Sequence, residues 1–314
     1  MRTALFTHPI CIDHDPGPGH PESPDRLRAI MRALETEEFA LLDRREAPEA
    51  TVDQILLAHP RAHVDRLLQL VPDEGLIDID MDTAINPASG QAALRAAGAV
   101  CAAVDAVMAG SDDPEGARNA FCAVRPPGHH AETARAMGFC LFNSVAIGAL
   151  HARQAHGLGR VAVVDFDVHH GNGTQEIFWQ TPELMYASTH QVPLYPGTGA
   201  VTERGCAGNV VNVPLPPMAG SPEFRQAMTA QILPAIDAFK PEMILISAGF
   251  DGHTLDPMAG LDLTDGDFAW ATEKLATLAA AHCRGRIVSA LEGGYNLMAL
   301  AGSTAAHLRV LMAS

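Results

Sequence analysis

The stretch Val161–Gly173, VAVVDFDVHHGNG, decides the fold class of this chain. Four apolar residues lead directly into a segment that contains Asp165, Asp167 and His169. A short apolar run without polar alternation is typical of a strand covered on both faces, as in a parallel sheet. Ligands of open α/β sheets collect at the carboxyl ends of such strands. The stretch therefore predicts a buried parallel strand that ends in a cluster of metal-binding side chains.

Two further segments repeat this pattern. Met243–Phe250 is a mostly apolar run that leads into Asp251, and Arg286–Leu291 leads into Glu292–Tyr295, EGGY. The carboxyl ends of parallel strands meet at one edge of a sheet. Three strands that deliver polar groups to the same edge predict an active site there.

Strand-like and helix-like segments alternate along the chain, which predicts βαβ units around a parallel sheet. Ser23 and Pro24 are typical of a helix start. No repeat, low-complexity tract or linker interrupts the pattern, so we expect one α/β domain over residues 1–314. The predicted strands are Thr3–Phe6, Asn119–Val124, 161–165, Leu184–Ser188, Val210–Val213, 243–248 and 287–291. The predicted helices are Asp25–Leu34, Val52–Ala58, Arg61–Leu70, Pro87–Met108, Asn143–His156, Pro222–Phe239, Asp265–Cys283 and Leu297–Met312.

The composition argues against several classes of protein. Hydrophobic residues make up 47% of the 314 residues and the formal net charge is −16, so we expect a sizeable core and no nucleic-acid binding. No run of roughly 18 apolar residues is present, so no membrane span is expected. The amino terminus becomes polar too early for a signal peptide, which favours a cytoplasmic protein. None of the six cysteines forms a Cys-x-x-Cys pair, so we expect reduced, buried thiols rather than structural zinc.

The candidate metal ligands come from two strands. Asp167 and His169 are two residues apart and project to the same side of an extended chain, so both can bind one ion, and Asp251 supplies a third ligand. Three protein ligands leave a position open for water, as in catalytic sites. An Asp-His-Asp set suits zinc, and oxygen-rich ligation also suits iron(II) or manganese. Asp165 either orients a histidine through a hydrogen bond or binds a structural cation, and the sequence leaves both open.

Candidate acid–base groups lie on two loops. His129 and His130 follow the strand 119–124 on a Pro-Gly loop. A neutral imidazole there can take a proton from water at the metal and return it to a leaving amine. Gly293 and Gly294 let the chain turn sharply and approach a ligand closely. Tyr295 can then donate its hydroxyl to a developing oxyanion opposite the metal.

Taken together, these motifs resemble the histone deacetylase superfamily of zinc-dependent amidohydrolases, over about residues 4–312. The His-Pro-Glu opening and the His-Gly-Asn-Gly-Thr run are nearer the class II branch, to which bacterial deacetylases and acetylpolyamine amidohydrolases are related. The matching segments are His20–Glu22 with Arg26 and Leu27, Arg125–His130, Gly138–Cys140 with Asn143, Asp165–Thr174, Pro196–Gly199, Asn212–Pro214, Gly249–Asp251 and Glu292–Tyr295.

The resemblance implies a single-domain arginase/deacetylase fold with a central parallel sheet of about eight strands. It implies one zinc ion per chain, with iron(II) as the alternative, and removal of acetyl or other short acyl groups from lysine side chains or similar amines. His130 would be the general base and acid, His129 its electrostatic partner, and Tyr295 would polarise the substrate carbonyl. The implied zinc ligands are Asp167, His169 and Asp251.

The resemblance also implies a substrate tunnel and structural potassium. Gly138 would accept a hydrogen bond from the substrate amide, and Gly293 would lie at the substrate. Phe139 and Tyr195 would wall the tunnel, with Met258 at its mouth. One potassium site would involve Asp165, Asp167, His169, Ser188 and Thr189, and a second would involve Phe178, Thr181 and Leu184.

Three positions depart from the family pattern. Asn172 stands where one branch has aspartate, which implies weaker support for His130 as a cation and a base that titrates nearer neutrality. Tyr195 stands where phenylalanine is common, which leaves the acyl preference open. Met258 is apolar where polyamine-specific relatives can use a glutamate. This favours an acylated lysine protein or peptide over a small acetylated amine such as an acetylpolyamine.

Other functions are less well supported by the sequence. A two-metal ureohydrolase needs further carboxylates, but Gly171 and His253 stand at the positions in question. A non-catalytic binder of acylated ligands would not need His129, His130 and Tyr295. The physiological substrate and the oligomeric state, including a homo-oligomer, stay open at this level.

Overall fold

The computed structural model describes residues 2–110 and 113–314; the other three residues of the predicted domain lie outside it. An eight-stranded sheet forms the centre of the fold, in the order β2-β1-β5-β10-β9-β6-β7-β8, and all its neighbouring strands are parallel. The predicted fold class and sheet size are confirmed. The strands are β1 (Thr3–Thr7), β2 (Asp43–Glu46), β5 (Asn119–Cys122), β6 (Val161–Asp165), β7 (Leu184–Gln191), β8 (Val210–Leu215), β9 (Met243–Ala248) and β10 (Ile287–Leu291).

The strand order places the three strands that precede the predicted site side by side. β9 lies between β10 and β6, and Asp165 at the end of β6 is in register with Ser247 of β9 and with Ser188 of β7. Every residue of β6, β9 and β10 is buried. Because both faces of these strands are covered, charged residues appear only where a strand ends.

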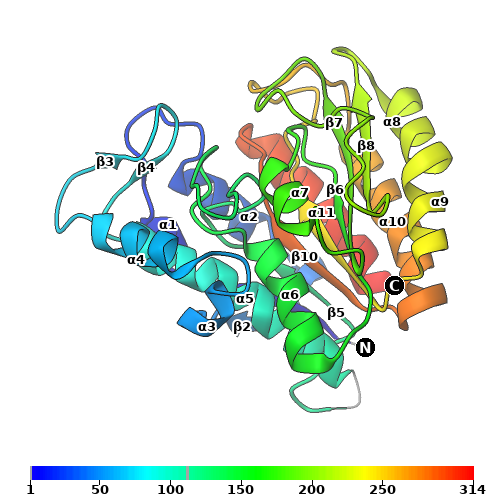
Figure 1. The fold of residues 1–314 in the computed structure, drawn as a ribbon, viewed down its shortest axis with the longest axis horizontal. Helices are drawn as coiled ribbons and strands as arrows, with labels where there is room; N and C mark the ends of the chain where they lie inside the picture. The colour runs from blue at the N-terminus through cyan, green and yellow to red at the C-terminus, as the bar shows by residue number, and fades with distance from the viewer. Residues whose placement is uncertain (1, 111–112) are drawn as a thin grey trace.

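Helices cover both faces of the sheet (Figure 1). α5 packs against β5 and β10, and α6 packs against β6 and β9. Figure 1 shows α8, α9 and α10 on the opposite side. The helices are α1 (Ile10–Asp13), α2 (Pro24–Ala33), α3 (Val52–Ile55), α4 (Arg61–Leu70), α5 (Ser89–Ala109), α6 (Ser144–His156), α7 (Asn172–Phe178), α8 (Ser221–Ala227), α9 (Leu233–Phe239), α10 (Asp265–Cys283) and α11 (Leu297–Ala313).

Several elements differ from the sequence-based prediction. The predicted helix Pro222–Phe239 is divided into α8, a π-helical turn over Met228–Ile232, and α9. Pro234 explains the division, because proline lacks the N–H for a regular helical hydrogen bond and its ring crowds the preceding turn. The edge strand β2 was not predicted, since its sequence DRRE has no apolar residue. Charged side chains are common on edge strands, where they oppose pairing with other chains.

Short elements were also missed. α1, α7 and a two-stranded antiparallel sheet of β3 (Ile77–Asp78) and β4 (Ala84–Ile85) have too few residues to show a periodic pattern. The predicted helix Val52–Ala58 is shorter than expected and ends at Ile55. Five of the six cysteines are free and buried as predicted, whereas Cys206 is free and exposed.

Helix α5 lies largely inside the fold. Within the described ranges it is the one helix that is long and apolar enough to cross a membrane, and 67% of its most apolar window is buried. Burial in the core explains the apolar composition of this helix. The packing is close: at Gly98, a Cβ would clash with the backbone of Pro48 and Ala50.

Candidate active site

Three loops at the carboxyl ends of β6, β9 and β10 meet around one cluster of buried ligands. Asp167 and His169 follow β6, and Asp251 follows β9. The Nδ1 atom of His169 lies 3.1 Å from Oδ1 of Asp167 and 3.1 Å from Oδ2 of Asp251. All three side chains are buried, and one donor atom of each lies within 4.8 Å of the others. The structure thus brings together the three residues predicted as metal ligands.

Backbone N–H groups hold the two carboxylates in place. Gly293 N donates to Oδ2 of Asp167 at 2.8 Å, and Val168 N donates to Oδ1 of Asp251 at 2.9 Å. A Cβ on Gly293 would clash with the Asp251 carboxylate, and a Cβ on Gly249 would clash with Asp167. Both positions therefore require glycine because the backbone passes directly beside a ligand.

The electrostatics of this cluster suit a cation. Burial and the neighbouring Asp167 raise the pKa of Asp251 to about 7. Burial alone would lower the pKa of His169, but Asp167 and Asp251 reverse this effect and raise it to about 10. The two buried carboxylates together carry more negative charge than the single imidazole can neutralise. The donor set therefore fits a divalent ion with an open coordination position.

His129 and His130 are held beside these ligands by separate partners. Oε2 of Glu292 accepts hydrogen bonds from Gly128 N at 2.7 Å and His129 N at 3.1 Å, which fixes the loop after β5. Asp165 binds Nδ1 of His129 at 3.0 Å through Oδ2. Of the two roles left open for Asp165, the structure shows the orientation of a histidine. Asp167 and Asp165 outweigh the effect of burial and raise the pKa of His129 well above its usual range.

His130 is oriented by Asn172. The Asn172 side chain donates from Nδ2 to Glu132 Oε1 at 2.8 Å, so its Oδ1 faces His130 Nδ1, also at 2.8 Å. An amide oxygen only accepts, which places the His130 proton on Nδ1 and leaves Nε2 free to take a proton. Burial, His129 and His169 lower the pKa of His130 well below its usual range. The two imidazoles thus differ in charge, although their ring centres are only 4.0 Å apart.

A narrow cavity of about 170 Å³ opens onto this cluster. Phe139 and Tyr295 pack edge to face across it, with ring centres 5.9 Å apart. The Tyr295 hydroxyl makes no hydrogen bond within residues 2–110 and 113–314, so it is available to a ligand. Except for Asp82, every residue that lines the cavity was predicted at the site. The lining residues are Asp82, His130, Gly138, Phe139, His169, Tyr195, Met258 and Tyr295.

Comparison with known proteins identifies the family. The histone deacetylase domain matches residues 20–311. The chain belongs to the histone deacetylase family. The family predicted from the motifs is confirmed, and the chain is a hydrolytic deacetylase of a family that is generally metal-dependent.

Named relatives support this assignment. Histone deacetylase 10, chloroplastic, of Oryza sativa subsp. japonica is 41% identical over 93% of this chain and 70% of its own length. A histone deacetylase-like amidohydrolase of Pseudomonas aeruginosa is 37% identical over 94% of this chain and 82% of its own. A crystal structure of the HDA15 HD domain superposes with a TM-score of 0.92 at 37% identity, and covers 100% of this chain and 88% of that one.

Sequence reasoning missed the residues that support the tunnel wall of this deacetylase. Asp82 Oδ1 accepts from Gly138 N at 3.2 Å, and Thr83 Oγ1 accepts from Phe139 N at 3.1 Å. Phe139 has a φ of 68°, which non-glycine residues rarely adopt. The segment between β3 and β4 therefore holds the wall in an unfavourable conformation. No local sequence signal marks this contact, because more than fifty residues separate its two sides.

A buried ion network supports Tyr295 from behind. The Arg26 guanidinium lies 4.8 Å from the Tyr295 ring centre, and its Nε donates to Gly294 O at 2.6 Å. Glu22 binds Arg26 at 2.8 Å and Arg125 at 2.5 Å, and all three side chains are fully buried. Glu22, Arg26 and Arg125 belong to motifs that carried the family resemblance, but their contacts with one another were not predicted.

The two sets of residues predicted to bind potassium have different surroundings in the structure. Asp165, the first residue of the first set, ends β6 beside Ser188 of β7. In the second set, the carbonyl oxygens of Phe178, Thr181 and Leu184 do converge on one point. That point is occupied by the side-chain amide of Asn209, whose Nδ2 lies 3.0, 3.2 and 2.9 Å from the three oxygens. Its Oδ1 accepts from Ala207 N at 3.3 Å, which fixes the orientation of the amide.

Glu22 provides a test of the buried network. Glu22→Gln removes the charge that Arg26 and Arg125 share, and breaking a buried ion pair costs about 3–5 kcal/mol of unfolding free energy. We expect a loss of this size in urea denaturation followed by circular dichroism. The matched control is Glu38→Gln, because Glu38 also forms a bidentate pair with an arginine, Arg309, but at the surface. Water screens that pair, so the control should be nearly neutral. Equal losses in both variants would contradict the network's role.

Proposed function

We propose that this deacetylase removes acetyl or other short acyl groups from lysine side chains, with a zinc ion bound by Asp167, His169 and Asp251. One observation carries the proposal: His169, which lies within 4.8 Å of the other two buried ligands, lines the same cavity as His130 and Tyr295. When bound, zinc would act as a Lewis acid on the acyl carbonyl and on water. Iron(II) is the alternative ion, because imidazole and carboxylate ligands suit it as well.

The protein's own residues supply proton transfer and charge stabilisation. His130 Nε2 accepts a proton from the attacking water, since its Nδ1 is committed to Asn172. The same nitrogen then returns the proton to the leaving amine. The Tyr295 hydroxyl donates a hydrogen bond to the carbonyl oxygen as negative charge develops there. Burial and the neighbouring His129, which is charged and paired with Asp165, keep the pKa of His130 low, so that His130 stays neutral before the reaction.

The cavity suits the stem of an acylated lysine. Phe139, Met258 and Tyr195 supply an apolar wall, which matches four methylene groups without polar atoms to satisfy. A second candidate substrate is an acetylpolyamine, because the Asp82 carboxylate also lines the cavity and would attract a second amine. Asp82 thus opposes the preference that Met258 indicates.

A substrate panel separates the two candidates. We expect the zinc-loaded enzyme to hydrolyse acetyl-lysine peptides faster than acetylspermidine or acetylputrescine, measured as kcat/KM. Asp82→Asn should leave this order unchanged. A preference for acetylpolyamines that Asp82→Asn abolishes would establish the second candidate. Loss of acyl-lysine hydrolysis throughout the panel would refute the first.

Tyr295→Phe tests the role of the hydroxyl. It keeps the ring that packs against Phe139 and Arg26 and removes only the hydrogen-bond donor. We expect kcat to fall by roughly 10²–10³-fold, as when an oxyanion donor is removed, with little change in thermal stability. Tyr186→Phe is unsuitable as a control, since that hydroxyl bonds Asp165. Tyr195→Phe is suitable and should retain most of kcat. A fully active Tyr295→Phe enzyme would contradict the assignment.

One structural potassium ion, rather than two, belongs to this proposal. Support for the first ion comes from the Asp165 carboxylate, which ends β6 beside Ser188 of β7. At the second set of residues, Nδ2 of Asn209 already lies within hydrogen-bonding distance of the three carbonyl oxygens that would bind the ion, and its two N–H groups can donate to two of them at a time. We therefore propose that the Asn209 amide replaces the second potassium ion that the family resemblance implies.

Potassium binding can be counted directly. After dialysis against potassium with no other alkali ion, we expect about one ion per wild-type chain by elemental analysis. Asn209→Ala exposes the carbonyl oxygens of Phe178, Thr181 and Leu184 and should show a larger potassium-dependent rise in melting temperature than the wild type, which binds only the first ion. About two potassium ions in the wild type would show that the amide does not replace the second one.

A further inference from the structure

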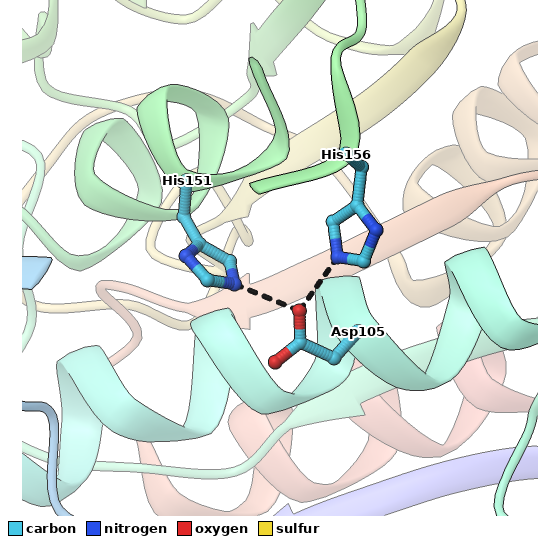
Figure 2. Close-up of side chains that lie close together, drawn as sticks. All are labelled: Asp105, His151 and His156. Atoms are coloured by element: carbon cyan, nitrogen blue, oxygen red, sulfur yellow. Dashed lines mark hydrogen bonds and ion pairs between the residues drawn. The ribbon is translucent and has the colours of Figure 1, made fainter. Parts of the chain in front are cut away.

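A second cluster of metal-binding side chains lies outside the cavity, between α5 and α6. It consists of Asp105 on α5 and of His151 and His156 on α6 (Figure 2). Figure 2 shows both imidazoles pointing toward one carboxylate oxygen, and each Nε2 lies 2.7 Å from Asp105 Oδ1. Among the described residues, ligand atoms of three His, Cys, Asp or Glu side chains converge only here and at Asp167, His169 and Asp251.

The cluster is reachable from solvent and yet held by packed elements. The Asp105 side chain is 50% exposed, His156 25% and His151 11%. Asp105 Oδ2 makes no hydrogen bond to the described part of the chain. An ion bound here would therefore keep open positions for water, with its protein ligands on two helices that pack against each other.

We propose that Asp105, His151 and His156 bind a divalent transition-metal ion that is separate from the catalytic one. Two imidazoles and one carboxylate are the donors that zinc, nickel and copper share, whereas calcium and magnesium prefer oxygen alone. None of the three residues lines the cavity, so an ion at this place would not take part in the deacetylation itself.

The spacing shows what must move when the ion binds. Ligand bonds of about 2.0–2.1 Å at tetrahedral angles place two ligand atoms about 3.3 Å apart. The distances of 2.7 Å from each Nε2 to Asp105 Oδ1 are those of hydrogen bonds, so protons occupy these two contacts when no ion is bound. For an ion to bind, the nitrogen and oxygen atoms must move apart by roughly 0.6 Å. His156 permits this opening, because it is the last residue of α6 and a left-handed Gly157 follows it.

Nearby charge favours a cation. Asp105 lines a surface hollow together with Glu46, Asp113 and Glu115, and Arg45 is the one basic residue among the lining side chains. Several carboxylates around one guanidinium give a negative local potential, which raises the local concentration of cations. The ion would tie α5 to α6, which packs against β6, and would stabilise the folded state in proportion to its concentration.

Nickel provides a probe that can be told apart from the catalytic metal. Untagged, zinc-loaded enzyme is dialysed against micromolar nickel, and both metals are counted by elemental analysis. We expect about one nickel ion per chain with zinc retained, together with a rise in melting temperature. His156→Gln should weaken nickel binding by about tenfold or more and abolish the rise.

The matched control is His282→Gln. His282 Nε2 lies 2.8 Å from Asp237 Oδ1 at the surface, but this pair has no third ligand. The control variant should bind nickel as the wild type does. The proposal fails if the wild type binds no nickel beyond what displaces zinc, or if His156→Gln binds nickel as tightly as His282→Gln. Acyl-lysine hydrolysis by both variants separates this outcome from a failure of the catalytic site.

Discussion

Two buried carboxylates at the ends of neighbouring strands are the constraint on which the rest of the structure depends. Asp167 and Asp251 are essentially without solvent exposure and lie beside the same imidazole. Like charges in a water-excluded site are unfavourable unless donors and positive charge surround them. The backbone N–H groups of Gly293 and Val168 meet part of that need, and the divalent ion that we propose would meet the rest. The loops after β6, β9 and β10 follow the paths that bring these groups into position.

The same constraint explains the layer of buried charge behind the site. Glu292 holds the backbone of the histidine loop, while Glu22 joins Arg26 to Arg125 beneath Tyr295. Each of these acids is buried, and each has donors directed at it. A shift of any of these loops would leave a buried charge without its partner, at a cost of several kcal/mol. Ion pairing here therefore fixes the positions of catalytic groups more than it adds to stability.

Oxygen or nitrogen atoms that could bind a cation converge at three of the places described above. The distances between these atoms differ from place to place and indicate what occupies each one. In the cavity, the imidazole nitrogen lies 3.1 Å from each carboxylate, close to the separation found around a metal. At Asp105 the two imidazole nitrogens lie 2.7 Å from the carboxylate oxygen, so hydrogen bonds join the three side chains until an ion replaces the protons. Around Asn209, an amide fills the point on which the carbonyl oxygens converge. Ligand type alone does not distinguish these cases, because the occupant also depends on distance and on competing donors.

The sequence by itself determined the parallel α/β architecture, because unbroken apolar runs such as Val161–Val164 are stable only when both faces are covered. It also determined which side chains end the strands, and the glycines beside them. The tertiary structure decided which of these residues meet. Three contacts between distant segments illustrate this. His129 pairs with Asp165, Thr83 supports Phe139, and Asp105 meets two histidines of α6. Such contacts leave no local periodicity, since they follow from the packing of whole elements, and only folding brings their partners within hydrogen-bonding distance.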